Sequence, residues 1–284
     1  MVNQHWARLG VASVAIAAST WIAPATQAAT LVNTELVLSV DASGSVSPVE
    51  FALQQQGYVA AFRDAELIEL IAQLDRGIAV TLQYWGTIPA GALGWYHITD
   101  AASAHAFADA IAATTNPFSR SATNIAAALD SATTLLLTNA FEGDRRVIDI
   151  SGDGTQNVNL AGTAFCSAVY ESANSTDPNC TSLVTTARDR ANAAGITLNG
   201  LPILTDFAPL DDYYLTYVVG GEGAFIQAAE TFGDFGTAVK TKIKREIAPA
   251  PGAASVPEPS MVLGVLALGG LGATVKRWRE QSAQ

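Results

Sequence analysis

The stretch Glu35–Glu50, ELVLSVDASGSVSPVE, determines the fold that we expect for this chain. An apolar run ends at Asp41, a short polar loop follows, and a helix begins soon afterwards. Ser47 is suited to the N-cap, Pro48 to the first helical position, and Glu50 completes a capping box. The stretch therefore predicts a buried strand, a tight loop and a helix, in the order found in α/β sheets.

The loop after this strand carries oxygen ligands at alternate positions. Asp41 offers a carboxylate, Ser43 and Ser45 offer hydroxyls, and Gly44 permits a tight bend. In an open α/β sheet such a loop lies at the carboxyl edge of the strands, where ligands bind. These hard donors are the kind that Mg²⁺, Mn²⁺ or Ca²⁺ prefers. The pattern by itself is equally compatible with a plain polar turn between a strand and a helix.

Apolar periodicity predicts alternating helices and strands over residues 29–248. This alternation argues for a doubly wound, Rossmann-like α/β fold, with a mainly parallel central sheet and helices on both faces. We expect helices at residues 49–62, 67–74, 101–113, 125–137, 181–194 and 234–247, and later strands at 77–84, 95–98, 145–150, 196–204 and 224–228. Asp234 should cap the last helix, and the lysines near its end, Lys242 among them, suit the helix dipole.

Two further polar loops follow the first one in the sequence. Thr123 precedes the helix predicted from residue 125, and Asp153 with Gly154 follows the apolar strand around Ile148. Each has a simpler interpretation, Thr123 as a helix N-cap and Asp153 as part of an Asp-Gly turn. Asp149 lies inside the strand, where a buried carboxylate needs partners, and we expect it either to support the ligands of the site from behind or to have a structural role.

In order and residue type, the three loops resemble the metal-ion-dependent adhesion site (MIDAS) of von Willebrand factor A (VWA) domains. The matching positions are Asp41, Ser43, Ser45, Thr123 and Asp153. From about residue 34 to 247 the chain also resembles an uncharacterised family of exported bacterial proteins of VWA type. The resemblance implies that the three hydroxyls coordinate a cation directly and that the two aspartates act through water. Mg²⁺ is the expected cation, with Mn²⁺ or Ca²⁺ as alternatives. Family members often have glycine before the threonine, where this chain has Ser121-Ala122.

Residues 1–28 are predicted to be a secretory signal peptide. Arg8 provides the positive charge, Leu9–Ile22 the apolar region, and Thr26–Ala28 a cleavage site with small flanking residues. The apolar region is interrupted by serine and threonine, and it is shorter than the roughly 20 residues that span a bilayer. We therefore expect export rather than a permanent N-terminal anchor.

The C-terminal end carries a second predicted targeting signal. Residues 249–259 form a Pro/Ala linker that ends in Pro257-Glu258-Pro259, and an apolar and basic segment, 260–284, follows. An apolar run before basic residues alone indicates a stop-transfer helix. With the Pro-Glu-Pro motif, the tail resembles the PEP-CTERM sorting signal. That resemblance implies cleavage by an exosortase-type membrane protease, and only transient membrane attachment, in a Gram-negative bacterium that makes extracellular polysaccharide.

Charge and cysteine content restrict the possible partners. The net charge of −11 disfavours binding to nucleic acid or to anionic membranes. Cys166 and Cys180 lie in an insertion of small polar residues, at about 157–180. In an exported protein a disulfide is the preferred interpretation, and two unpaired thiols are the alternative. Zinc is disfavoured because no histidine lies nearby.

The sequence favours a binding protein over an enzyme. It has no G-x-S-x-G motif, no G-x-G-x-x-G after a strand, and only His97 and His105 outside the signal peptide. A phosphoaspartate nucleophile at Asp41 is disfavoured because Ser43, rather than an acid, stands two positions on. We expect an exported, metal-dependent adhesion module that binds a carboxylate of a protein or an acidic matrix component. The alternative is a structural or assembly protein of the extracellular matrix with a vestigial metal site.

Overall fold

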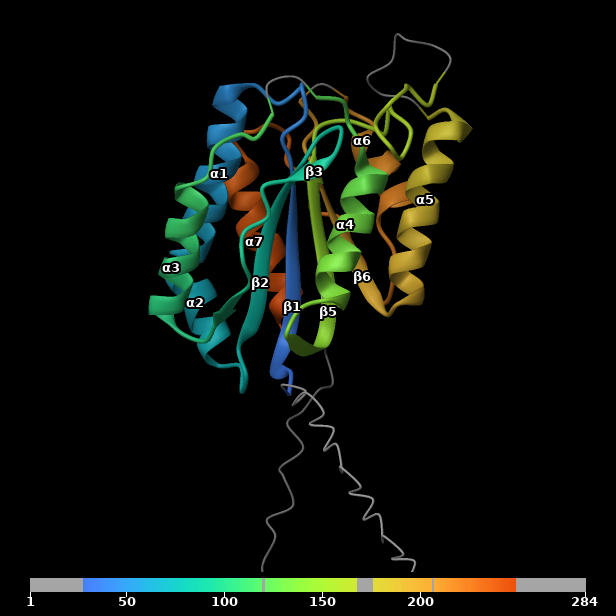
Figure 1. Ribbon diagram of the computed structural model, residues 1–284. Coiled ribbons are helices and arrows are strands. Elements are labelled where there is room, and N and C mark those ends of the chain that lie inside the picture. The colour runs from blue at the N-terminus through green and yellow to red at the C-terminus, as the bar shows by residue number, and fades with distance from the viewer. Residues whose placement is uncertain (1–27, 119–120, 168–175, 206, 249–284) are drawn as a thin grey trace, which may run out of the picture. The chain divides into compact units, whose positions relative to one another are not determined.

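The computed structural model describes residues 28–118, 121–167, 176–205 and 207–248 (Figure 1). The predicted signal peptide up to residue 27, the linker 249–259, the segment 260–284 and residues 168–175 of the insertion lie outside these ranges. Within the described ranges, no helix is both long and apolar enough to cross a membrane.

A mainly parallel sheet forms the centre of the domain, as the sequence predicts. The strands β1 (Thr30–Asp41), β2 (Ile78–Trp85), β5 (Phe141–Gly152) and β6 (Ile196–Pro202) are parallel. Two short strands, β3 (Pro89–Ala90) and β4 (Tyr96–Ile98), pair antiparallel with β2. The order is β3-β2-β1-β5-β6, so the longest apolar strand of the chain is central.

Helices cover both faces of this sheet (Figure 1). One face packs against α1 (Pro48–Phe62), α2 (Ala65–Ala72), α3 (Ala101–Ala112) and α7 (Phe235–Ile247). The other packs against α4 (Ile125–Leu137), α5 (Pro178–Ala193) and α6 (Leu210–Tyr213). On β1, Leu36 and Leu38 contribute to the first core while Val37 contributes to the second, because successive side chains of a strand point to opposite faces. The predicted doubly wound fold is confirmed.

The start of α1 is fixed to the end of β1. The N–H of Glu50 donates to Ser47 Oγ at 3.3 Å, and the N–H of Ser47 donates to Glu50 Oε2 at 2.8 Å, so the predicted capping box is present. Gln54, fully buried on the same helix, donates through Nε2 to the carbonyl of Asp41 at 3.1 Å. Both ends of the loop between β1 and α1 are therefore held in place.

Several predicted boundaries differ from those in the structure. The predicted strand 224–228 forms only isolated bridges to β6, which join Gly200 to Ile226 and Ile203 to Ala229. Helix α5 begins at Pro178 rather than at residue 181, since Asp177 caps it and proline is favourable in the first turn. Asp234 is the N-cap residue of α7, as predicted, but its side chain makes no capping hydrogen bond because its carboxylate accepts from Thr231 Oγ1.

Two tertiary links join distant parts of the chain. The predicted disulfide Cys166–Cys180 is present, with its Cα atoms 5.2 Å apart. In the core, Lys242 Nζ of α7 lies 2.6 Å from Asp149 Oδ1 and 2.6 Å from Glu246 Oε1, with all three side chains fully buried. The structural role expected for Asp149 is confirmed.

Candidate metal centre

The carboxyl ends of β1 and β5 form the point where the strand order changes direction. The chain leaves β1 for β2 on one side, while β5 leads to β6 on the other. Asp41 is the last residue of β1, and Asp153 directly follows β5. In open α/β sheets this crevice is the usual ligand-binding position.

All five residues predicted for the site are brought together there. Ser43 Oγ lies 3.1 Å from Ser45 Oγ and 3.5 Å from Thr123 Oγ1. Ser45 Oγ donates to Asp153 Oδ1 at 2.7 Å. The N–H of Ser43 donates to Asp41 Oδ1, also at 2.7 Å, which fixes the turn of the first loop. Three loops thus place three hydroxyls and two carboxylates in one cluster.

The simpler interpretation of Thr123 as a helix N-cap is wrong. Asn124 is the N-cap of α4, and its Oδ1 accepts from the N–H of Ala127 at 3.2 Å. The hydroxyl of Thr123 therefore has no capping role and faces Ser43 instead.

Ser121, where the chain departs from the family pattern, helps to join the loops. Its carbonyl accepts from the N–H of Gly44 at 2.7 Å, and its Oγ accepts from the N–H of Thr87 at 2.5 Å. A Cβ at Gly44 would lie 2.8 Å from this carbonyl, so the approach requires glycine. The first two loops are consequently held against each other by the backbone.

The carboxylate of Asp41 lies in a position that is unfavourable for a negative charge. It is fully buried, and burial together with the negative charge of Asp153 holds its pKa well above the usual range, although hydrogen bonds from Ser43 partly oppose this. Its Oδ2 has no hydrogen-bond partner among the described residues. A Cβ at Gly152 would lie 2.8 Å from Oδ2, so the backbone closes tightly on this atom.

These observations fit a hard divalent cation. The donors are oxygens, a buried carboxylate oxygen is left unsatisfied, and nearby negative charges repel each other. Among the described residues, no group of three or more histidine, cysteine, aspartate or glutamate side chains could hold a metal. A cation held here would therefore depend on hydroxyls to complete its ligand set.

Sequence reasoning missed Tyr214, which lies beneath this cluster. It begins a π-helix, η1 (Tyr214–Val218), and its hydroxyl is fully buried without a hydrogen-bond partner in the described part of the chain. A Cβ at Gly152 would lie 2.9 Å from this hydroxyl and 2.8 Å from Asp41 Oδ2, so the hydroxyl and the carboxylate approach the same point of the backbone. Burial, and then the charges of Asp41 and Asp153, raise the pKa of Tyr214 well above its usual range. The run of tyrosines at 213, 214 and 217 was the only sequence signal.

A cavity of about 460 Å³ opens beside the first loop. Ser43 and Ser47 contribute polar atoms to its wall, while Val46, Phe51 and Phe118 contribute apolar surface. Because Ser43 belongs to both the cavity and the cluster, a bound group could contact both at once.

Comparison with solved structures shows that the chain has a VWA-like fold. The vWF domain of the type V pili tip protein Mfa5 from Porphyromonas gingivalis aligns with a TM-score of 0.50 and 13% identity, over 78% of this chain and 98% of that one. The PilB minor pilin from Streptococcus sanguinis aligns with a TM-score of 0.54 and 15% identity, over 79% of this chain and 64% of that one. The pilus adhesin SpaC from Lactobacillus rhamnosus GG aligns with a TM-score of 0.53 and 15% identity, over 76% of this chain and 30% of that one. This chain thus spans less than two thirds of the last two, and the similarity is one of fold.

Residues 31–251 match the model of the family described as "Protein of unknown function (DUF1194)", and the chain belongs to that family. No curated protein matches it in sequence.

Proposed function

We propose that this protein is an exported binding module that holds a divalent cation and through it binds a carboxylate of a protein or an acidic matrix component. Mg²⁺ is the expected cation, with Mn²⁺ or Ca²⁺ as alternatives. The observation that carries the proposal is the convergence of five oxygen-bearing side chains from three loops: Asp41, Ser43, Ser45, Thr123 and Asp153.

The balance of ligands supports binding of an acidic group. With mostly neutral hydroxyl ligands, a bound cation would retain positive charge to attract an outside carboxylate. Ser45 is exposed, whereas Asp41 and Asp153 are buried, so a partner would approach from the hydroxyl side. The cavity next to Ser43 provides apolar surface for the group that carries the carboxylate.

A catalytic role has less support from the arrangement of side chains. His97 lies on β4, which pairs with the first residues of β2, at the end of the sheet away from the cluster. Its Nε2 is 2.8 Å from the carbonyl of Arg76. We therefore propose that the protein is not an enzyme.

The cellular location is also part of the proposal. Signal-like segments at residues 1–28 and 249–284 support export, transient attachment to the inner membrane and processing by an exosortase-type protease. A disulfide is typical of proteins in oxidising compartments. The cell surface or extracellular polysaccharide of a Gram-negative bacterium fits both observations.

Calorimetric titration of Mg²⁺, Mn²⁺ and Ca²⁺ tests the metal site. Wild type should bind at least one of these cations. Asp41→Asn, which preserves the side-chain shape, should bind about 10- to 100-fold more weakly because it loses a carboxylate that would orient a bound water. Asp75→Asn is the matched control, since Asp75 is exposed just before β2 at the opposite end of the sheet. Equal binding by wild type and Asp41→Asn would favour the alternative, a structural matrix protein with a vestigial site.

A further inference from the structure

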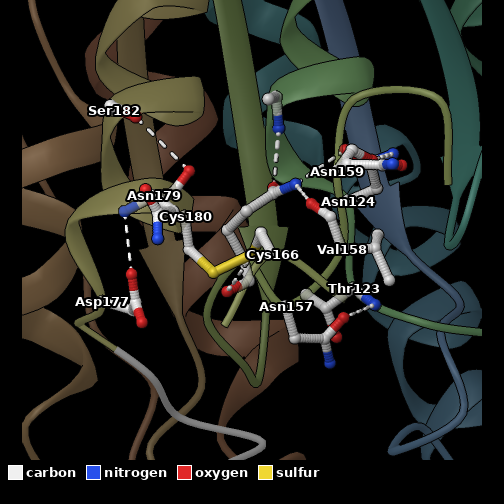
Figure 2. The surroundings of a disulfide bond; sticks show 12 residues. Thr123, Asn124, Asn157, Val158, Asn159, Cys166, Asp177, Asn179, Cys180 and Ser182 are labelled. Atoms are coloured by element: carbon white, nitrogen blue, oxygen red, sulfur yellow. Dashed lines mark hydrogen bonds between the residues drawn. A yellow bond between two sulfur atoms is a disulfide. The ribbon is translucent and has the colours of Figure 1, made fainter. Parts of the chain in front are cut away.

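A hairpin formed by residues 157–166 contacts the second loop of the candidate metal centre, and the disulfide Cys166–Cys180 joins the end of this hairpin to α5 (Figure 2). We propose that Asn157 positions Thr123 and that the disulfide holds Asn157 in place, so that reducing the disulfide weakens metal binding. This inference rests on the proposed function, to which it adds control by redox state.

Asn157 binds both backbone polar groups of Thr123. The N–H of Thr123 donates to Asn157 Oδ1 at 3.0 Å, as Figure 2 shows, and the N–H of Asn157 donates to the carbonyl of Thr123 at 3.1 Å. The hydroxyl of Thr123 lies 3.5 Å from Ser43 Oγ. Because Thr123 is fixed through its backbone, the position of its hydroxyl in the cluster depends on Asn157.

The neighbouring Gln156 holds the residues that follow Thr123. Its side chain is fully buried, Oε1 accepts from the N–H of Ala126 at 3.0 Å, and Nε2 donates to Asn124 Oδ1 at 2.8 Å. The segment after β5 therefore fixes both the loop and the first turn of α4. A displacement of this segment would move Thr123 and the start of α4 together.

The hairpin transmits the constraint of the disulfide to Asn157. The carbonyl of Asn157 accepts from the N–H of Cys166 at 3.1 Å, and Val158 pairs antiparallel with Phe165. Cys166 is bonded to Cys180, which is fully buried in the first turn of α5. Since α5 packs against α4, the disulfide anchors the hairpin to the same layer of helices that carries Thr123.

Reduction would release this anchor. A dithiol reductant supplies two electrons and two protons, the S–S bond breaks to give the thiols of Cys166 and Cys180, and the reductant becomes a disulfide. Cys166 is half-buried, so its sulfur is the more accessible end. Loss of a group that orients a metal ligand typically lowers metal affinity about 10- to 100-fold.

Mn²⁺ titration of the full-length chain measures the effect. We expect the oxidised wild type to bind about 10- to 100-fold more tightly than the double variant Cys166→Ser/Cys180→Ala, which avoids metal binding by an added reductant. Circular dichroism shows whether the variant is folded. If it is folded and binds within twofold of wild type, the inference is overturned while the proposed function stands.

A second pair of variants tests the inference if the double variant does not fold. In the oxidised chain, Asn157→Ala removes the acceptor for the N–H of Thr123 and should lower Mn²⁺ affinity about 10-fold or more. Asn159→Ala is the matched control, because among the described residues the Asn159 side chain bonds only to Thr163, within the hairpin. Equal affinities of the two variants would overturn the inference.

Hydrogen exchange of the Thr123 amide gives a readout that needs no metal. In the metal-free chain we expect faster exchange of this amide in Asn157→Ala and in the double cysteine variant, and no change in Asn159→Ala. Unchanged exchange in all three variants would contradict the positioning role. If the oxidised wild type binds no cation, the proposed function is overturned, and control of metal binding by the disulfide is overturned with it. The exchange rates of the Thr123 amide still test separately whether Asn157 and the disulfide position Thr123.

Discussion

Asp149 and Asp153 lie four residues apart near the end of β5, and each interacts with a second buried carboxylate. Asp149 meets Glu246, and Lys242 Nζ lies within 2.6 Å of both. The negative charge of Asp153 repels that of Asp41, and no positively charged side chain is among the groups that shift the pKa of Asp41. The protein supplies its own cation to the first pair, whereas it surrounds the second with hydroxyls that suit a cation from solution. We therefore propose that a buried acidic pair contributes to stability in one place and to cation binding in the other.

Removing the internal cation has the largest expected effect. Lys242→Met retains most of the side-chain volume but leaves Asp149 and Glu246 without their positive partner. Such a change typically costs about 3–5 kcal/mol, and we expect the free energy of unfolding in urea to fall by that amount. Lys240→Met is the control, because the ion pair of Lys240 with Asp64 is partly exposed and such pairs contribute about 0–1 kcal/mol. Equal losses in both variants would show that Lys242 does not compensate the pair.

The Lys242 cluster also predicts a dependence of stability on pH. Burial, and then the charge of Asp149, raise the pKa of Glu246 from 4.5 to about 8. Because the pKa is higher in the folded state, its stabilising contribution is complete below about pH 4.5 and is lost as the pH rises through about 8. We expect the free energy of unfolding to fall by at most about 1.4 kcal/mol per pH unit in this window. Urea titrations of Glu246→Gln should lack this fall, and a profile parallel to that of wild type would contradict the prediction.

The smallest expected effect comes from the second pair. In metal-free buffer, Asp41→Asn removes a buried negative charge near Asp153, so it should stabilise the protein by roughly 0.5–2 kcal/mol, as substitutions at functional sites often do. A cation at 100 times its Kd should stabilise wild type by about 2.7 kcal/mol and the variant far less, which reverses their order. Thermal unfolding with and without Mg²⁺ measures both differences. A less stable Asp41→Asn in both conditions would place this pair in the same structural class as the first.

Much of the fold could be predicted because its signals are local. The capping box at Ser47 and the apolar strand that ends at Asp41 involve residues only a few positions apart, and the structure places both as expected. The order of the three loops also predicted which side chains would meet, since parallel strands bring their carboxyl ends to one edge. The predicted strand at 224–228 was wrong because an apolar run shows only that a segment can pair, whereas the extent of its pairing with β6, here isolated bridges, depends on a segment elsewhere in the chain.

Lys242 shows where local reasoning is insufficient. The sequence places it among lysines that suit the end of a helix dipole, and its neighbours Lys240 and Lys244 do form partly exposed ion pairs. Lys242 is instead fully buried against Asp149, which lies on a strand distant in the sequence. Helical spacing does place Lys242 on the buried face with Phe235 and Val239. The identity of its buried partner Asp149 depends on how that face packs on the sheet.

The sequence by itself determined the α/β class, the strand and loop that carry Asp41, and the residue types gathered at the candidate centre, because these follow from short-range patterns. Only the tertiary structure decided which buried acidic pair receives Lys242, that Tyr214 lies beneath the cluster, and that Asn157 holds Thr123. Each of these depends on packing between segments that are far apart in the chain. Charge compensation and ligand positioning in this protein are therefore properties of the assembled core.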